Sequence, residues 1–174
     1  GELFNLVESS RLTIVFGKSG IGKTSLLKAG LIPELQKNYF FPIYLRIDYS
    51  SGKSPLSQVK EMIYQKLVQR DKTVSEIGSL TLWEYFVSLN LFDGQLTPVL
   101  IFDQFEEAFT IGKEKSQMVQ EFILELSDLA ENRVPMAVHE KRRDRLKLDT
   151  LPGNEQSFRM IISLREDYLA NFES

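Results

Sequence analysis

The chain of 174 residues contains no cysteine and only one histidine, His139, which removes several kinds of chemistry at once. Without cysteine there is no disulfide, no thiol nucleophile and no cysteine-based zinc site, so a reducing cytoplasm is the default setting. The lone histidine has no metal-ligand or triad partner near it in the sequence, and we assign it no role. Any chemistry must come from other side chains.

The chain also lacks a long apolar run and a strong excess of charge. No segment approaches the roughly 20 apolar residues that span a bilayer, and the first residues lack the basic-then-apolar layout of a signal peptide. The formal net charge of −3 gives no global attraction to nucleic acid or to an anionic membrane. We therefore expect a cytoplasmic protein without membrane contact, and we do not expect nucleic acid as a partner.

The composition is that of an ordinary globular protein, with 43% hydrophobic and 26% charged residues. This length supports one domain with its own core, so we expect residues 1–174 to form a single domain. Both ends lie close to expected strands, which suggests that the domain is a fragment of a larger multidomain protein.

The most informative stretch is residues 17–24, GKSGIGKT, which fits the phosphate-loop pattern G-x-x-x-x-G-K-[ST] at every fixed position. An apolar run at 12–16 precedes it and a helical pattern at 25–31 follows it. A strand that enters the loop and a helix that leaves it are the context that this motif requires. A chance match would lack that context.

The residue types explain the chemistry of this loop. Glycines let several backbone N–H groups approach phosphate oxygens, and the helix that follows favours anions at its N-terminus. Lys23 would place its charge on the β- and γ-phosphates, and the Thr24 hydroxyl would ligate Mg²⁺. The side chains of Lys18 and Ser19 stand at free positions and have no role of their own. The nucleotide-binding residues expected are Gly17, Lys18, Ser19, Gly20, Ile21, Gly22, Lys23, Thr24 and Ser25.

A second informative stretch, residues 98–103, reads PVLIFD. Consecutive apolar residues that end in a carboxylate are typical of a central parallel strand, buried on both faces, which delivers an acid at its C-terminal edge. Ligands of open α/β sheets bind at that edge, where the phosphate loop also lies. Asp103 is therefore the candidate for holding Mg²⁺, through the water shell of the ion.

Two glutamates, Glu106 and Glu107, follow this acid. A carboxylate three or four residues past the metal acid can orient or deprotonate the attacking water. The alternative is a helix N-terminus that simply prefers acids in its first turn. We expect at least one of the two to be functional, with Glu106 ahead of Glu107.

The apolar run at 158–164 predicts another buried strand, with Arg165 at its exit. A cation at this edge of the sheet could sense the γ-phosphate or neutralise charge that develops in the transition state. The alternative is an arginine paired with the acids of the following helix start, Glu166 and Asp167. We favour a role for Arg165 near the nucleotide.

The remaining pattern alternates helices with strands. Helices are expected at 2–10, at 23–31 with an end before Pro33, from Pro55 to Leu67, at 80–91 and at 116–131. A strand is expected at 42–48, with Arg46 at the surface rather than directed at the phosphates. The aromatic residues of the fourth helix are expected to pack in the core rather than to stack on bases; they are Trp83, Tyr85 and Phe86.

The segment 139–148 holds five Lys or Arg residues against two acids. It resembles a mobile surface insertion with a solvated charged face, and contact with a partner or nucleic acid is the alternative interpretation. Charge alone does not decide between them.

Three ordered motifs together resemble the novel-STAND group of P-loop NTPases, the STAND class of signal-transduction ATPases with numerous domains, which are related to NACHT and AAA-type ATPases. The loop continues as SLLKAGLIP, similar to the family's SSLLRAGLLP. The stretch 98–110, PVLIFDQFEEAFT, resembles its Walker B signature, and 163–169, SLREDYL, resembles its LRxDF sensor segment. The motifs span residues 16–169. The Gly-Arg-Glu-type motif that usually precedes the loop in this family is absent or truncated at Gly1.

The resemblance implies an α/β, three-layer P-loop fold of the additional-strand class, with a mostly parallel central sheet in which the sensor strand separates the loop strand from the Walker B strand. It implies that Lys23, Thr24, Asp103, a following glutamate and Arg165 handle ATP, ADP and Mg²⁺. Many relatives are bacterial and several act in anti-phage defence. They resemble switches that ADP holds closed. Ligand sensing by C-terminal repeats permits ATP binding and self-association, which activates an N-terminal effector domain. A nucleotide-binding oligomerisation scaffold with negligible hydrolysis is the alternative function.

Overall fold

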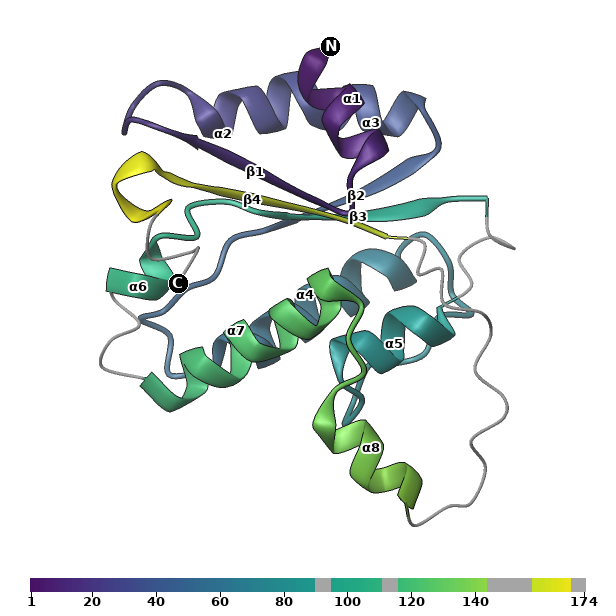
Figure 1. Ribbon diagram of the computed structural model, residues 1–174. Coiled ribbons are helices and arrows are strands. Elements are labelled where there is room, and N and C mark those ends of the chain that lie inside the picture. The colour runs from purple at the N-terminus through teal and green to yellow at the C-terminus, as the bar shows by residue number, and fades with distance from the viewer. Residues whose placement is uncertain (90–94, 111–115, 144–157, 170–174) are drawn as a thin grey trace.

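The computed structural model describes residues 1–89, 95–110, 116–143 and 158–169, and it has a parallel sheet between two layers of helices (Figure 1). The sheet has four strands in the order β1-β4-β3-β2. They are β1 (Leu12–Gly17), β2 (Phe40–Leu45), β3 (Thr97–Phe102) and β4 (Arg159–Arg165). All pairings are parallel. The α/β fold expected from the sequence is confirmed.

The strand order places the functional motifs at one edge. The sensor strand β4 lies between the loop strand β1 and the Walker B strand β3, as the resemblance implied. In the register, Gly17 is opposite Arg165, and Phe102 is opposite Ile162. Since parallel strands end at the same edge, the phosphate loop, the acid after β3 and the arginine that ends β4 meet there.

One face of the sheet carries the helices that flank the phosphate loop. They are α1 (Glu2–Ser9), the short α2 (Lys23–Ser25), the π-helix η1 (Leu26–Leu31) and α3 (Ile32–Lys37). Their buried side chains form a small apolar cluster with Val99, Ile101 and Ile161 of the sheet. We call it the smaller cluster; its helical members are Val7, Leu27, Leu31 and Leu35.

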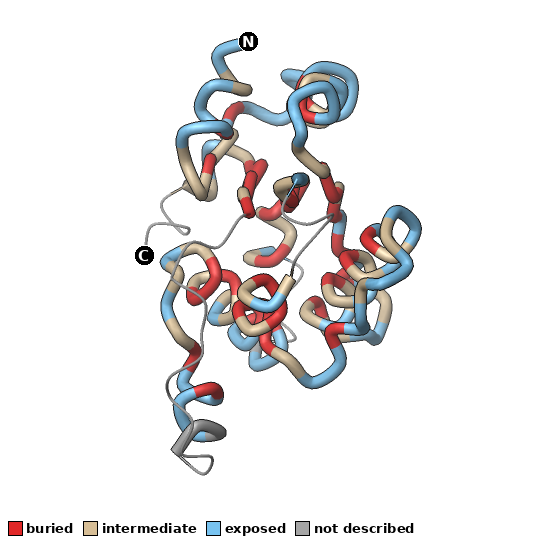
Figure 2. The backbone as a smooth tube through the Cα atoms, turned by 90° about the vertical axis from the view of Figure 1, so that its right-hand side faces the viewer, coloured by how far each residue is buried: buried red, intermediate tan, exposed pale blue. Residues whose placement is uncertain are grey.

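The other face carries α4 (Pro55–Val68), α5 (Leu82–Ser88) and α7 (Ser116–Glu131), with α6 (Glu107–Thr110) and α8 (Met136–Arg143) beside them. Here lies the larger cluster, which includes Phe102, Phe122 and Phe158. Figure 2 shows the buried stretches gathered in the interior, with exposed stretches around them. The predicted packing of Trp83, Tyr85 and Phe86 is confirmed, since all three are buried.

The helical run after the phosphate loop differs from the prediction. We expected the helix at 23–31 to end before Pro33, with Gly30 near its C-terminus, but α2, η1 and α3 form one continuous run from Lys23 to Lys37. Proline has no N–H and cannot donate to a preceding carbonyl. The wider π-helical turn precedes it, with the Ile32 N–H donating to the Leu27 carbonyl. Pro33 is accommodated in the first turn of α3.

The strand predicted at 42–48 has different bounds. It begins at Phe40 and ends at Leu45, so Arg46 and Asp48 lie beyond it. The Asp48 carboxylate accepts from the Ser50 N–H at 2.9 Å, which is a local side-chain turn that competes with strand pairing.

Two helices also differ in extent. The helix expected at 80–91 spans only Leu82–Ser88, because Thr81 forms a capping box with Glu84 and Leu89 is already extended. The basic segment at 139–148 begins inside α8, and residues 144–148 lie outside the described residues. The prediction of the long helix at 116–131 is confirmed. No helix in the described parts of the chain is long and apolar enough to cross a membrane.

Candidate nucleotide site

The phosphate loop joins β1 to α2 and depends on glycine at fixed places. Gly20 and Gly22 have φ angles of 79° and 87°, backbone values that residues other than glycine rarely adopt. A Cβ on Gly17 would lie 2.4 Å from Ile21 Cδ1. The loop can therefore close on itself and bring its backbone N–H groups to one place, as the sequence predicts.

Lys23, the first residue of α2, folds back over this loop. Its ammonium donates to the Gly17 carbonyl at 2.9 Å and to the Lys18 carbonyl at 3.0 Å. An ammonium has three donors, so one remains for another acceptor. The ammonium of Lys23 thus lies against the backbone of the phosphate loop, where it is expected to contact the phosphates.

Asp103, the residue after β3, is 4% exposed and carries several hydrogen bonds. The Thr24 hydroxyl donates to its Oδ2 at 2.7 Å, and the Tyr44 hydroxyl donates to the same oxygen at 2.6 Å. The Gln104 N–H donates to Oδ1 at 3.0 Å. The structure therefore joins the two residues predicted as metal ligands, Thr24 and Asp103.

Tyr44 also contacts the candidate site, and no sequence motif predicted this. Burial, and then its hydrogen bond to Asp103, raise the pKa of the Tyr44 hydroxyl above its usual value. The Lys28 ammonium lies 4.3 Å from the centre of its ring, in cation–π contact. The sequence offered no signal for Tyr44, because its place beside the acid depends on the pairing of β2 with β3.

After the turn that follows Asp103, the two glutamates make different contacts. Gln104 has a φ of 56°, and the Phe105 N–H donates to the Ser163 carbonyl of β4 at 2.9 Å. Within the described residues, the buried Oε2 of Glu106 has no hydrogen-bond partner. Glu107 instead lies 3.5 Å from the guanidinium of Arg46, which is half exposed, as predicted for Arg46 at the surface.

Arg165 shows the contact that the sequence left as the alternative. Its Nη2 lies 2.5 Å from Asp167 Oδ2, and its guanidinium is 5.8 Å from the centre of the Tyr168 ring. The register still places Arg165 beside Gly17. Two buried polar atoms on β4, Arg165 Nε and Ser163 Oγ, have no partner among the described residues.

Comparison with protein-family models gives a match over residues 1–174 to Novel STAND NTPase 1, nSTAND1. The chain belongs to this family. A search of curated proteins and a search of solved structures each returned no match. Membership of nSTAND1 implies that the domain binds a nucleotide.

The residues of this nSTAND1 domain fit a nucleotide with a divalent cation. The glycine loop offers backbone donors, and Thr24 and Asp103 offer the oxygen ligands that Mg²⁺ prefers. The unpartnered polar atoms of Ser163 and Arg165 lie on β4, and that of Glu106 lies in the turn after β3, whose end is at the same edge. Buried polar atoms without partners are costly, so their presence here suits a polar ligand.

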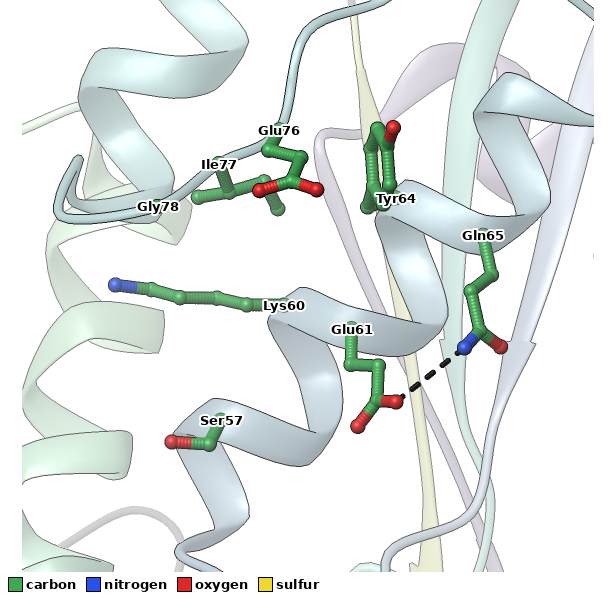
Figure 3. Close-up of a pocket in the computed structure, with 8 residues that line it drawn as sticks. All are labelled: Ser57, Lys60, Glu61, Tyr64, Gln65, Glu76, Ile77 and Gly78. Atoms are coloured by element: carbon green, nitrogen blue, oxygen red, sulfur yellow. Dashed lines mark hydrogen bonds between the residues drawn. The ribbon is translucent and has the colours of Figure 1, made fainter.

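A cavity of about 470 Å³ lies elsewhere on the nSTAND1 domain, between α4 and residues 76–78 (Figure 3). Its walls include Lys60, Glu61 and Glu76. In Figure 1, α4 covers the face of the sheet opposite α2, which follows the phosphate loop. None of the predicted nucleotide-site residues lines this cavity.

Proposed function

We propose that this chain is the ATP-binding and ATP-hydrolysing switch domain of a STAND-type signalling or defence protein, and that it depends on Mg²⁺. The hydrogen bond between Thr24 and Asp103 carries the proposal, because it joins the end of the phosphate loop to the acid after β3. These two residues would hold Mg²⁺ beside the phosphates that the loop binds. The buried Glu106 Oε2, which has no hydrogen-bond partner among the described residues, adds an acceptor suited to water.

Each residue has a separate part in this proposal. Lys23 would exchange its bonds to the loop carbonyls for bonds to the phosphates, and Thr24 and Asp103 would hold Mg²⁺. Mg²⁺, when bound, neutralises charge on the phosphate oxygens. Glu106 orients the attacking water, or accepts its proton, and Glu107 stays with Arg46. Arg165 leaves Asp167 to neutralise the charge that develops on the γ-phosphate.

The cellular part of the proposal follows from the family. In the STAND proteins that the sequence motifs resemble, the NTPase domain is linked to a sensor and an effector, and ATP in place of ADP allows self-association. We propose the same for this chain as one domain of a larger cytoplasmic protein. A scaffold that binds nucleotide but hydrolyses it negligibly is the competing function, since the cations of Lys23 and Arg165 are both held by the protein's own oxygens.

Single-turnover release of phosphate from ATP tests the proposal. The chain is mixed in excess over radiolabelled ATP with Mg²⁺, and phosphate is followed over time. We expect Lys23→Ala to slow the release by about a hundredfold or more, the usual effect of removing one group that stabilises developing charge.

Lys37→Ala is the matched control, since Lys37 is an exposed lysine at the end of α3. It should release phosphate at the wild-type rate. If wild-type chain binds ATP but releases phosphate no faster than Lys23→Ala, the hydrolytic function is rejected and the scaffold function takes its place.

A further inference from the structure

We propose that Tyr44 is a positioning residue for the metal site: its hydroxyl fixes the Asp103 carboxylate in the orientation that a nucleotide-bound divalent cation requires. The inference rests on the nucleotide and metal site of the proposed function and adds a residue to it. It concerns metal binding rather than hydrolysis, so the two can fail separately.

The sheet itself brings the two side chains together. Tyr44 is opposite Ile101 in the register of β2 and β3, and Ile101 precedes Asp103 by two residues. Side chains two residues apart on a strand share a face of the sheet. Tyr44 is long enough to span the diagonal, and its hydroxyl reaches Asp103 Oδ2 at 2.6 Å.

The ring of Tyr44 is held on the other side by the helices. It packs against the smaller cluster, and Lys28 of η1 lies over its face at 4.3 Å. A ring held between the sheet and the helices on this face cannot turn away freely. The hydroxyl is therefore a fixed donor rather than a mobile one.

The two carboxylate oxygens of Asp103 have different hydrogen-bond donors. Oδ2 accepts from Thr24 and from Tyr44, which uses both of its lone pairs. Oδ1 accepts from the Gln104 N–H, and within the described residues it keeps one lone pair. That oxygen is left to accept from the water shell of the cation. The Thr24 hydroxyl donates its proton to Oδ2 and keeps a lone pair for the metal.

Loss of the Tyr44 hydroxyl would weaken this arrangement. The rotation of an aspartate carboxylate about its last bond is soft, so its plane depends on the donors around it. Removing a hydrogen-bond partner of a metal-binding carboxylate typically costs about 10- to 100-fold in metal affinity. The loss should appear in metal binding and not in the binding of nucleotide alone.

Binding of Mn²⁺ to ADP-loaded chain tests the inference, with free Mn²⁺ followed by electron paramagnetic resonance. Tyr44→Phe keeps the ring and removes only the hydroxyl. We expect it to raise the Mn²⁺ dissociation constant by about tenfold or more. The affinity for ADP without metal should stay at the wild-type value, which also shows that the variant is folded.

Tyr85→Phe is the matched control. Tyr85 is also buried, and its hydroxyl donates to the Ser75 carbonyl at 3.2 Å, on an element of the opposite face. It should bind Mn²⁺ like wild type. The inference is overturned if Tyr44→Phe binds Mn²⁺ within twofold of wild type, if it loses metal-free ADP affinity equally, or if wild type binds no Mn²⁺ with ADP. Normal Mn²⁺ binding in wild type without phosphate release would reject only the proposed hydrolysis.

Discussion

The two faces of the sheet differ in what they bury and in what they leave available. The face under α4, α5 and α7 holds the larger cluster, where Phe102 and Phe105 each lie 6.0 Å from the ring of Phe122. The face under α1 and α3 has a smaller apolar cluster, and the hydrogen-bonded Tyr44 packs against it. The larger apolar cluster thus lies on one face, whereas the side chains that bond to Asp103, those of Thr24 and Tyr44, come from the other.

A single turn connects the two faces. Phe102 and Phe105 belong to the larger cluster, whereas Asp103, between them, bonds to Thr24 and Tyr44 on the loop side. The positive φ of Gln104 gives the chain the sharp change of direction that this requires. Asp103 is therefore held in place by the core residues on either side of it, Phe102 and Phe105, although its own side chain lies outside the larger cluster. If this division is right, changes on one face should leave the property of the other intact.

The largest effect is expected from Glu106→Gln, which should slow single-turnover phosphate release by about 10²- to 10⁴-fold, the usual share of a general base. The amide has nearly the same shape, so the free energy of unfolding in urea should not fall. Glu107→Gln, which removes only the partner of Arg46, should change the rate little. A larger loss in Glu107→Gln than in Glu106→Gln would reverse the two roles.

The next largest effect is expected from Phe122→Ala in the larger cluster. Phe122 is fully buried, so the cavity should lower the free energy of unfolding by about 3–5 kcal/mol. Urea unfolding measures the loss, and Leu124→Ala, on the exposed side of α7, should change it by less than about 0.5 kcal/mol. ADP affinity of the folded variant should match wild type. A parallel loss of ADP affinity would mean that the faces are coupled.

The smallest effect is expected from Asp167→Asn, which removes the acceptor that holds Arg165. The pair is largely exposed, with side-chain exposures of 42% and 57%, and such pairs contribute about 0–1 kcal/mol. Freeing the arginine should therefore raise phosphate release by at most about fivefold. Neutralising the adjacent acid in Glu166→Gln serves as the control. Slower release in Asp167→Asn would show that Asp167 itself takes part.

Much of the fold could be predicted because local patterns carry it. The apolar runs at 12–16, 98–103 and 158–164 became β1, β3 and β4, and the spacing in 116–131 became α7. The errors lie at the ends of elements. There, single hydrogen bonds decide, such as the capping of α5 by Thr81.

The sequence by itself determined the phosphate loop, the acid after β3 and the family, because each depends on residue types at fixed spacing along the chain. Only the tertiary structure decided that Tyr44 reaches Asp103, that Glu106 has an unpartnered oxygen while Glu107 faces Arg46, and that Arg165 turns to Asp167. The reason is physical. These contacts depend on which strands pair and how a turn bends, and sequence spacing does not encode distances between separate elements.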